Sequence, residues 1–141
     1  GLWKTINDFS KTKPIFGTCA GLILMAKKIS ENTAFTPLGL LNITVARNAY
    51  GRQTDSFSSN LTFQFPQRKA GSLKAIFIRA PRIELWEPEI KILATLDNNP
   101  VLIQQGLHMG ASFHPELTTN FEIHKYFVEL SKNVKTLSIV D

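Results

Sequence analysis

Cysteine is almost missing from this sequence, since Cys19 is the only one among 141 residues. A single cysteine excludes an intrachain disulfide and a zinc site built from several cysteines. Long apolar runs are missing as well: no stretch approaches the length of a membrane-spanning helix, and no secretory signal opens the chain. We therefore expect a protein of the reducing cytoplasm that has no membrane partner.

Acidic residues are outnumbered, with 11 aspartates and glutamates against 16 lysines and arginines. A nucleic-acid-binding protein gathers such an excess on one face, whereas here the basic residues are dispersed along the chain. Apolar residues make up 43% and charged residues 19% of the sequence, as in an ordinary folded domain. We therefore expect one domain over residues 1–141 and no nucleic-acid partner.

The segment 14–22 ends an apolar run in Cys19, which lies between Gly17 and Gly21 and is followed by helix-forming residues. This order is typical of a strand, a sharp turn and a helix. The glycines indicate close backbone contact, because a Cβ on either side of the cysteine would clash. The sulfur would then lie beside the first helical turn, where free N–H groups and the helix dipole favour a thiolate. The N–H of Ala20 could hold an oxyanion there.

A second chemical pattern follows an apolar run near the other end of the chain, where His114 and Glu116 flank Pro115. Side chains alternate along an extended segment, so the imidazole and the carboxylate should point to the same side. A carboxylate in that place can fix the tautomer of the imidazole and stabilise its charged form. With Cys19 they would form a nucleophile, a base and an orienting group.

Two simpler interpretations compete with this triad. A lone cysteine near an apolar run is most often a small core residue. A metal site formed by Cys19, His114, Glu116 and His124 is also conceivable. However, His124 falls in a helical pattern as a polar-face residue and His108 lies near a turn, so we expect no metal.

Gly17–Gly21 together with His114–Glu116 resembles the class I glutamine amidotransferases. Further matching segments narrow the resemblance to the glutaminase subunits of pyridoxal 5′-phosphate synthase: Gly39–Asn42, Arg47–Phe57, Phe77–Pro81 and Ser112–Thr118. The resemblance runs over almost the whole chain. It implies hydrolysis of L-glutamine to L-glutamate and ammonia, delivery of the ammonia to a synthase subunit for vitamin B6 synthesis, and no cofactor in this chain.

Arg47 and Arg79 each end an apolar strand pattern, a costly place for a charge without a use. They are candidates for binding an anion, and the resemblance implies that they and Ile78 contact the glutamine substrate. It also implies that the polar segment 48–60 faces the synthase subunit. A cysteine peptidase or isomerase with the same turn is a rival that these arginines disfavour. A second rival is a non-catalytic subunit that only docks on the synthase.

The family also has an N-terminal segment with a Gly-Gly-Glu-Ser loop that nothing in this sequence matches. We therefore expect this chain to be the C-terminal portion of the family domain and a poor glutaminase by itself.

The expected fold is a three-layer α/β domain with a mostly parallel sheet and flanking helices, as the strand-turn-helix unit and the resemblance to a flavodoxin-like fold both imply. Apolar periodicity predicts helices over 2–10, 20–29 and 120–134, the last with a capping box at 119–122. Alternation predicts strands over 41–46, 61–65, 75–78, 90–96, 101–105 and 107–113, with a hairpin turn at 97–100.

Overall fold

A computed structural model describes the backbone of residues 1–31, 33–47 and 56–140 and the side chains of these residues up to 132. Its helices are α1 (Leu2–Ser10), α2 (Ala20–Met25) and α3 (Glu122–Val140), with a 3₁₀ turn η1 (Pro115–Leu117). Its strands are β1 (Phe16–Thr18), β2 (Ala26–Ile29), β3 (Leu41–Ala46), β4 (Ser56–Phe63), β5 (Gly71–Ile78), β6 (Arg82–Trp86), β7 (Lys91–Leu96), β8 (Asn99–Gln105) and β9 (His108–Ala111).

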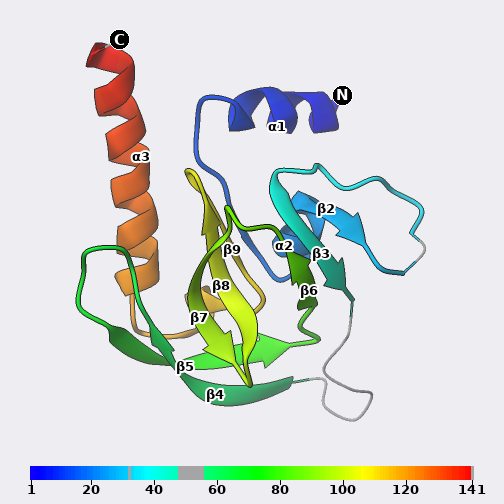
Figure 1. Ribbon diagram of the computed structural model, residues 1–141, viewed down its shortest axis with the longest axis vertical. Helices are drawn as coiled ribbons and strands as arrows, with labels where there is room; N and C mark the ends of the chain where they lie inside the picture. The colour runs from blue at the N-terminus through cyan, green and yellow to red at the C-terminus, as the bar shows by residue number, and fades with distance from the viewer. Residues whose placement is uncertain (32, 48–55, 141) are drawn as a thin grey trace.

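The strands form two sheets (Figure 1). A six-stranded sheet has the order β1-β9-β8-β7-β4-β5, and a three-stranded sheet has the order β2-β3-β6. The α/β class with flanking helices is confirmed, but the strand directions correct the expected mostly parallel sheet. Only β1/β9 and β2/β3 are parallel among the described pairings, and the other five are antiparallel. The reason is that β4/β5, β7/β8 and β8/β9 are neighbours in sequence, and a direct turn reverses the chain.

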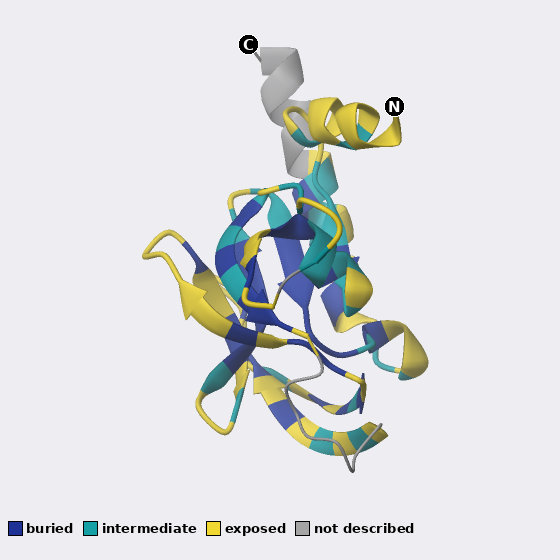
Figure 2. Ribbon diagram, turned by 90° about the vertical axis from the view of Figure 1, so that its right-hand side faces the viewer, coloured by how far each residue is buried: buried dark blue, intermediate teal, exposed yellow. Residues whose placement is uncertain are grey.

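The core lies on both faces of the larger sheet. Its buried strands lie at the centre of Figure 2. One cluster joins α3 to strands β4, β5, β7, β8 and β9, with Phe63, Phe77, Phe113 and Ile123 among its members. The other joins α2 and the small sheet to β8, with Leu22, Leu41, Ile83 and Ile103 among its members. Burial of apolar area on both faces gives the three layers.

The helix that follows Cys19 is shorter than the expected 20–29. It ends at Met25, and Ala26–Ile29 form β2 beside β3. The backbone N–H groups of Leu38, Gly39 and Leu40 donate to the carbonyls of Leu24, Ala26 and Met25, respectively. A continuing helix would use those carbonyls itself, so tertiary pairing overrides the local helix propensity here.

Other expected boundaries also shift. β4 begins at Ser56 instead of 61, because its serine-rich first half pairs residue by residue with β5. Residues 48–55 of the expected polar loop lie outside the described residues. β6 was not expected, and it forms because Ile83 is buried against β3. The N-terminus of α3 is capped by Asn120, whose Oδ1 accepts from the Glu122 N–H at 2.9 Å, and α3 runs beyond residue 134.

Several expectations hold. The helix over residues 2–10 and the strand over 41–46 are confirmed. The hairpin between β7 and β8 is confirmed too, and its turn residues Asp97 and Asn98 both have positive φ, 49° and 67°. That conformation matches the twist of a two-residue hairpin, and Asp and Asn tolerate it. Within the described part of the chain, the helices are too short or too polar to cross a bilayer.

β1 and α2 approach each other at Gly17. A Cβ built on Gly17 would contact the sulfur of Met25 and lie 2.6 Å from the carbonyl oxygen of Gly21. A Cβ on Gly21 would meet nothing within 4 Å. The expected need for glycine is therefore confirmed at Gly17 and wrong at Gly21. The carbonyl group of Gly21 lies against Gly17, whereas a side chain at position 21 would point into open space.

We predict that Gly17→Ala destabilises the protein by about 1–3 kcal/mol, because the added methyl group overpacks the contact with α2. Gly21→Ala is the matched control, and it should be neutral or stabilising, since alanine favours a helix. Denaturant midpoints of the two variants measure the difference. Equal destabilisation of both would contradict the contact described for Gly17.

Candidate active site

Cys19 occupies the turn between β1 and α2. Its backbone has φ 53° and ψ −107°, a conformation that a non-glycine residue adopts only when its surroundings hold it there. The Cys19 N–H donates to the Ala111 carbonyl at 2.9 Å, and its own carbonyl accepts from the N–H groups of Leu22 and Ile23. The chain thus turns directly from strand pairing into a helix, and the expected strand-turn-helix arrangement is present.

The thiol of Cys19 is half-buried, and its sulfur lies 3.6 Å from the Ile78 carbonyl oxygen, to which the S–H donates. Burial raises the pKa of the Cys19 thiol, the Ala20 N–H acts in the opposite direction, and the negative charge of Glu116 raises the pKa further. These effects act against the expected thiolate, since desolvation outweighs the single N–H at the start of α2.

His114 and Glu116 are held together by the 3₁₀ turn η1. The Nδ1 of His114 lies 2.8 Å from the Oε2 of Glu116. The two side chains meet as expected, although through a turn and not along an extended strand. Pro115 explains the difference, because its fixed φ suits the first position of the turn. The carboxylate accepts a hydrogen bond from the Nδ1–H of the imidazole, so Nε2 is the nitrogen left to act as a base.

The edge strand β5 brings the cysteine and the histidine together. The N–H of His114 donates to the Ile76 carbonyl at 2.9 Å, and the Cys19 sulfur contacts the Ile78 carbonyl. Carbonyls two residues apart point to the same side of a strand and are about 7 Å apart. The charge of Glu116 also acts on the thiol. Cys19, His114 and Glu116 therefore gather along one edge.

The candidate substrate residues lie near the same end of the sheets. Ile78 ends β5, and Arg79 follows it with φ 44°. Arg47 follows Ala46, which is the pairing partner of Arg82 on β6. The backbone N–H of Arg47 donates to the Glu31 carboxylate at 2.8 and 3.0 Å, and the Arg47 side chain is exposed. Arg79 thus follows the end of β5, and Arg47 follows the end of β3. The two ends are connected through β6, which follows β5 in the chain and pairs with β3.

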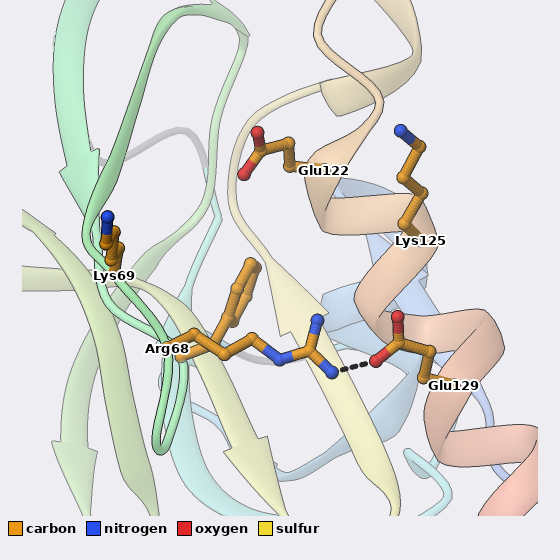
Figure 3. Close-up of a pocket in the computed structure, with 6 residues that line it drawn as sticks. Arg68, Lys69, Glu122, Lys125 and Glu129 are labelled. Carbon is orange, nitrogen blue, oxygen red and sulfur yellow. Dashed lines mark ion pairs between the residues drawn. The ribbon is translucent and has the colours of Figure 1, made fainter.

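A charged hollow lies elsewhere, between α3 and the segment that follows β4 (Figure 3). Arg68 forms an ion pair with Glu129 across it and lies over the Tyr126 ring, 5.2 Å from its centroid. None of the candidate active-site residues lines this hollow. The ion pair between Arg68 and Glu129 fastens α3 to the segment that follows β4.

His124 lies on the first turn of α3, beside the Phe16 ring at 6.1 Å. The conceivable metal site is therefore not assembled, because groups of three or more metal-ligating side chains are lacking among the described residues. His108 begins β9, as its position near a turn suggested. The carbonyls of Ile76 and Ile78, which organise the site, had no sequence signal because every residue has a carbonyl.

An α/β sheet that holds a cysteine at a strand-helix turn, with a histidine and a carboxylate at the same edge, is the arrangement expected of a glutamine amidotransferase. Family comparison agrees, since residues 1–133 match the model of the SNO glutamine amidotransferase family. The chain belongs to this family.

Individual relatives are similar over nearly the whole chain. The pyridoxal 5′-phosphate synthase subunit PdxT of Fervidobacterium nodosum is 45% identical over 92% of this chain and 69% of its own length. That of Solibacter usitatus is 48% identical over 90% of this chain and 67% of its own length. A glutamine amidotransferase crystal structure superposes with a TM-score of 0.85 at 38% identity, covering 94% of this chain and 69% of that one. The chain thus spans about two thirds of the length of these relatives.

We predict that the alkylation rate of Cys19 rises at a higher pH than that of an ordinary thiol, because burial and Glu116 raise its pKa. Iodoacetamide labelling across pH, followed by mass spectrometry, gives the profile. Cys19→Ala is the control and should take up no label, since the chain has no other cysteine. A plateau already reached at neutral pH would contradict the prediction.

Proposed function

We propose that the protein hydrolyses L-glutamine to L-glutamate and ammonia, with Cys19 as nucleophile, His114 as base and acid, and Glu116 as the group that orients His114. The observation that carries the proposal is the arrangement on β5, where neighbouring carbonyls hold the cysteine and the histidine. The bond between His114 and Glu116 supports the assigned order of roles.

The chemistry follows from the protonation states. The thiol is neutral at rest, so Nε2 of His114 accepts its proton as the sulfur attacks the carboxamide carbon. The N–H of Ala20 donates to the oxyanion of the tetrahedral intermediate. Collapse of this intermediate breaks the C–N bond, and the imidazolium gives its proton to the departing amide nitrogen, which leaves as ammonia. Water, deprotonated by the same imidazole, then hydrolyses the thioester and restores the thiol.

Glutamine recognition is assigned to Arg47, Arg79 and Ile78. A guanidinium binds a carboxylate through charge-assisted hydrogen bonds, and glutamine keeps a free α-carboxylate when its side-chain amide reacts. This requirement favours a free amino acid over a peptide as substrate.

The ammonia is proposed to pass to a synthase subunit that makes pyridoxal 5′-phosphate. The support is the similarity to proteins that are named as PdxT subunits of that synthase. The function is tested by measuring glutamine-dependent ammonia release in the presence of the synthase subunit. Complete absence of release, with a folded protein and a reactive Cys19, would contradict it.

We predict that Cys19→Ala abolishes glutamine hydrolysis, while Glu116→Gln keeps roughly tenfold to a hundredfold more residual turnover. The reason is that the orienting member of a triad is usually the least costly to remove. Glu87→Gln, which neutralises an exposed carboxylate outside the site, is the control and should match the unmodified protein. Equal losses in Cys19→Ala and Glu116→Gln would show that Glu116 does more than orient.

We predict that Arg47→Ala and Arg79→Ala each raise the KM for glutamine roughly tenfold to a hundredfold, because each removes one charge-assisted hydrogen bond. Alkylation of Cys19 by a neutral reagent should continue at the original rate. Arg82→Ala removes a neighbouring exposed arginine and serves as the matched control. Loss of alkylation together with glutamine use would mean that these arginines act on the cysteine instead.

A further inference from the structure

His108 joins the start of β9 to the segment that leads into β1. Its Nδ1 accepts a hydrogen bond from the Ile15 N–H at 3.1 Å. Its Nε2 lies 3.1 Å from the Ser10 carbonyl oxygen, to which it donates. A ring that accepts at Nδ1 and donates at Nε2 is a neutral imidazole in one tautomer. The side chain therefore bridges two backbone groups that lie five residues apart.

We propose that neutral His108 is a positioning residue for Cys19, because it fastens the 10–15 segment to β9 and so fixes the strand that carries the cysteine. The link to catalysis rests on the proposed role of Cys19. The contact itself does not depend on that role.

The path from His108 to Cys19 is short and continuous. Ile15 donates to the ring, and its carbonyl accepts from the Met109 N–H at 3.0 Å. The parallel pairing of β1 with β9 then runs for three residues, and the Cys19 N–H donates to the Ala111 carbonyl. β1 pairs with no other described strand. The imidazole therefore supplies a hydrogen-bond acceptor just before a very short ladder begins, where one bond is a large share of the total.

This bridge needs an uncharged ring. A proton on Nδ1 would point an N–H at the Ile15 N–H and remove the acceptor. Burial lowers the pKa of His108, while the Ser10 carbonyl acts in the opposite direction. Stability from the bridge is thus complete above the ordinary histidine pKa of about 6.5 and is lost as the pH falls through the lower folded value.

Charged and titratable groups also lie on the elements packed around His108. Asp8 of α1 pairs with Lys4 of the same helix and with Lys11 just after it. In the segment that follows α1, the ammonium of Lys13 lies 5.8 Å from the centroid of the Phe9 ring. On β8, the pairing partner of His108 is the neutral Gln105. On α3, His124 contacts Phe16 of β1.

The first test is nuclear magnetic resonance of the whole chain at pH 7.5. We expect the ¹⁵N shifts of His108 to show a protonated Nε2 and an unprotonated Nδ1, with slow exchange of the Ile15 amide. The opposite tautomer, or an imidazolium at this pH, would overturn the proposal without any variant being made.

The second test compares His108→Leu with His108→Gln. Leucine removes the acceptor, so the Ile15 amide should exchange about tenfold faster. Glutamine can accept at Oε1 and donate at Nε2, so it should restore slow exchange without titrating. The ratio of Ile15 exchange in the unmodified protein to that in His108→Gln should be near one at pH 8 and rise as the pH falls toward 5. A ratio that stays constant with pH would overturn the bridge, even where His108→Leu does not fold.

Turnover measurements show whether His108 positions Cys19 for catalysis or only stabilises the fold. We expect kcat to fall roughly tenfold to a hundredfold in His108→Leu with KM for glutamine little changed, because a displaced nucleophile slows the chemical step. His108→Gln should restore kcat. Faster Ile15 exchange with unchanged kcat would overturn the positioning role. If the unmodified protein releases no ammonia in the presence of the synthase subunit, the proposed function fails, and the exchange data still decide whether the bridge exists.

Discussion

The attachment of β1 to β9 is the constraint on which the rest of the site depends. β1 has three residues, yet it must hold Cys19 in a backbone conformation that the residue would not adopt alone. Glycines on both strands make the attachment possible. Gly17 allows the backbone of α2 to approach β1, and a Cβ on Gly110 would lie 2.5 Å from Leu22 of α2 and 3.0 Å from Leu41. The helix therefore packs down on the pair of strands, and the turn at Cys19 has no room to relax.

The edge of β5 supplies the second half of the site. An edge strand leaves half of its backbone groups without a neighbouring strand, and here the chain around the active site uses them. The Ile76 carbonyl accepts from the backbone N–H of His114, and the Ile78 carbonyl accepts from the thiol of Cys19. The Ser72 carbonyl accepts from the Asn120 side chain at 3.0 Å. The segment between β9 and α3 thus covers the edge while it presents the imidazole. Protection of the sheet and placement of the base are achieved by the same contacts.

The sequence predicted correctly those features that depend on residues close together in the chain. The turn at Cys19, the His114–Glu116 contact and the hairpin at Asp97 all followed from local chemistry. It failed where distant backbone decides. The end of α2 depends on the segment around Gly39, and the early start of β4 depends on its pairing with β5. The local pattern also favoured a thiolate, whereas burial raises the pKa of Cys19, because burial is a property of the whole fold and outweighs the local effect of the helix.

The raised pKa of Cys19 has a consequence for the lifetime of the protein. Peroxide oxidises thiolates far faster than thiols, so a cysteine that stays protonated at rest is slow to form sulfenic acid. Both methionines are also sheltered: Met25 packs beneath Gly17, and Met109 pairs with Phe16, each almost fully buried. The methionines are thus protected by burial in the two core clusters, whereas the half-buried cysteine is protected by its raised pKa between turnovers.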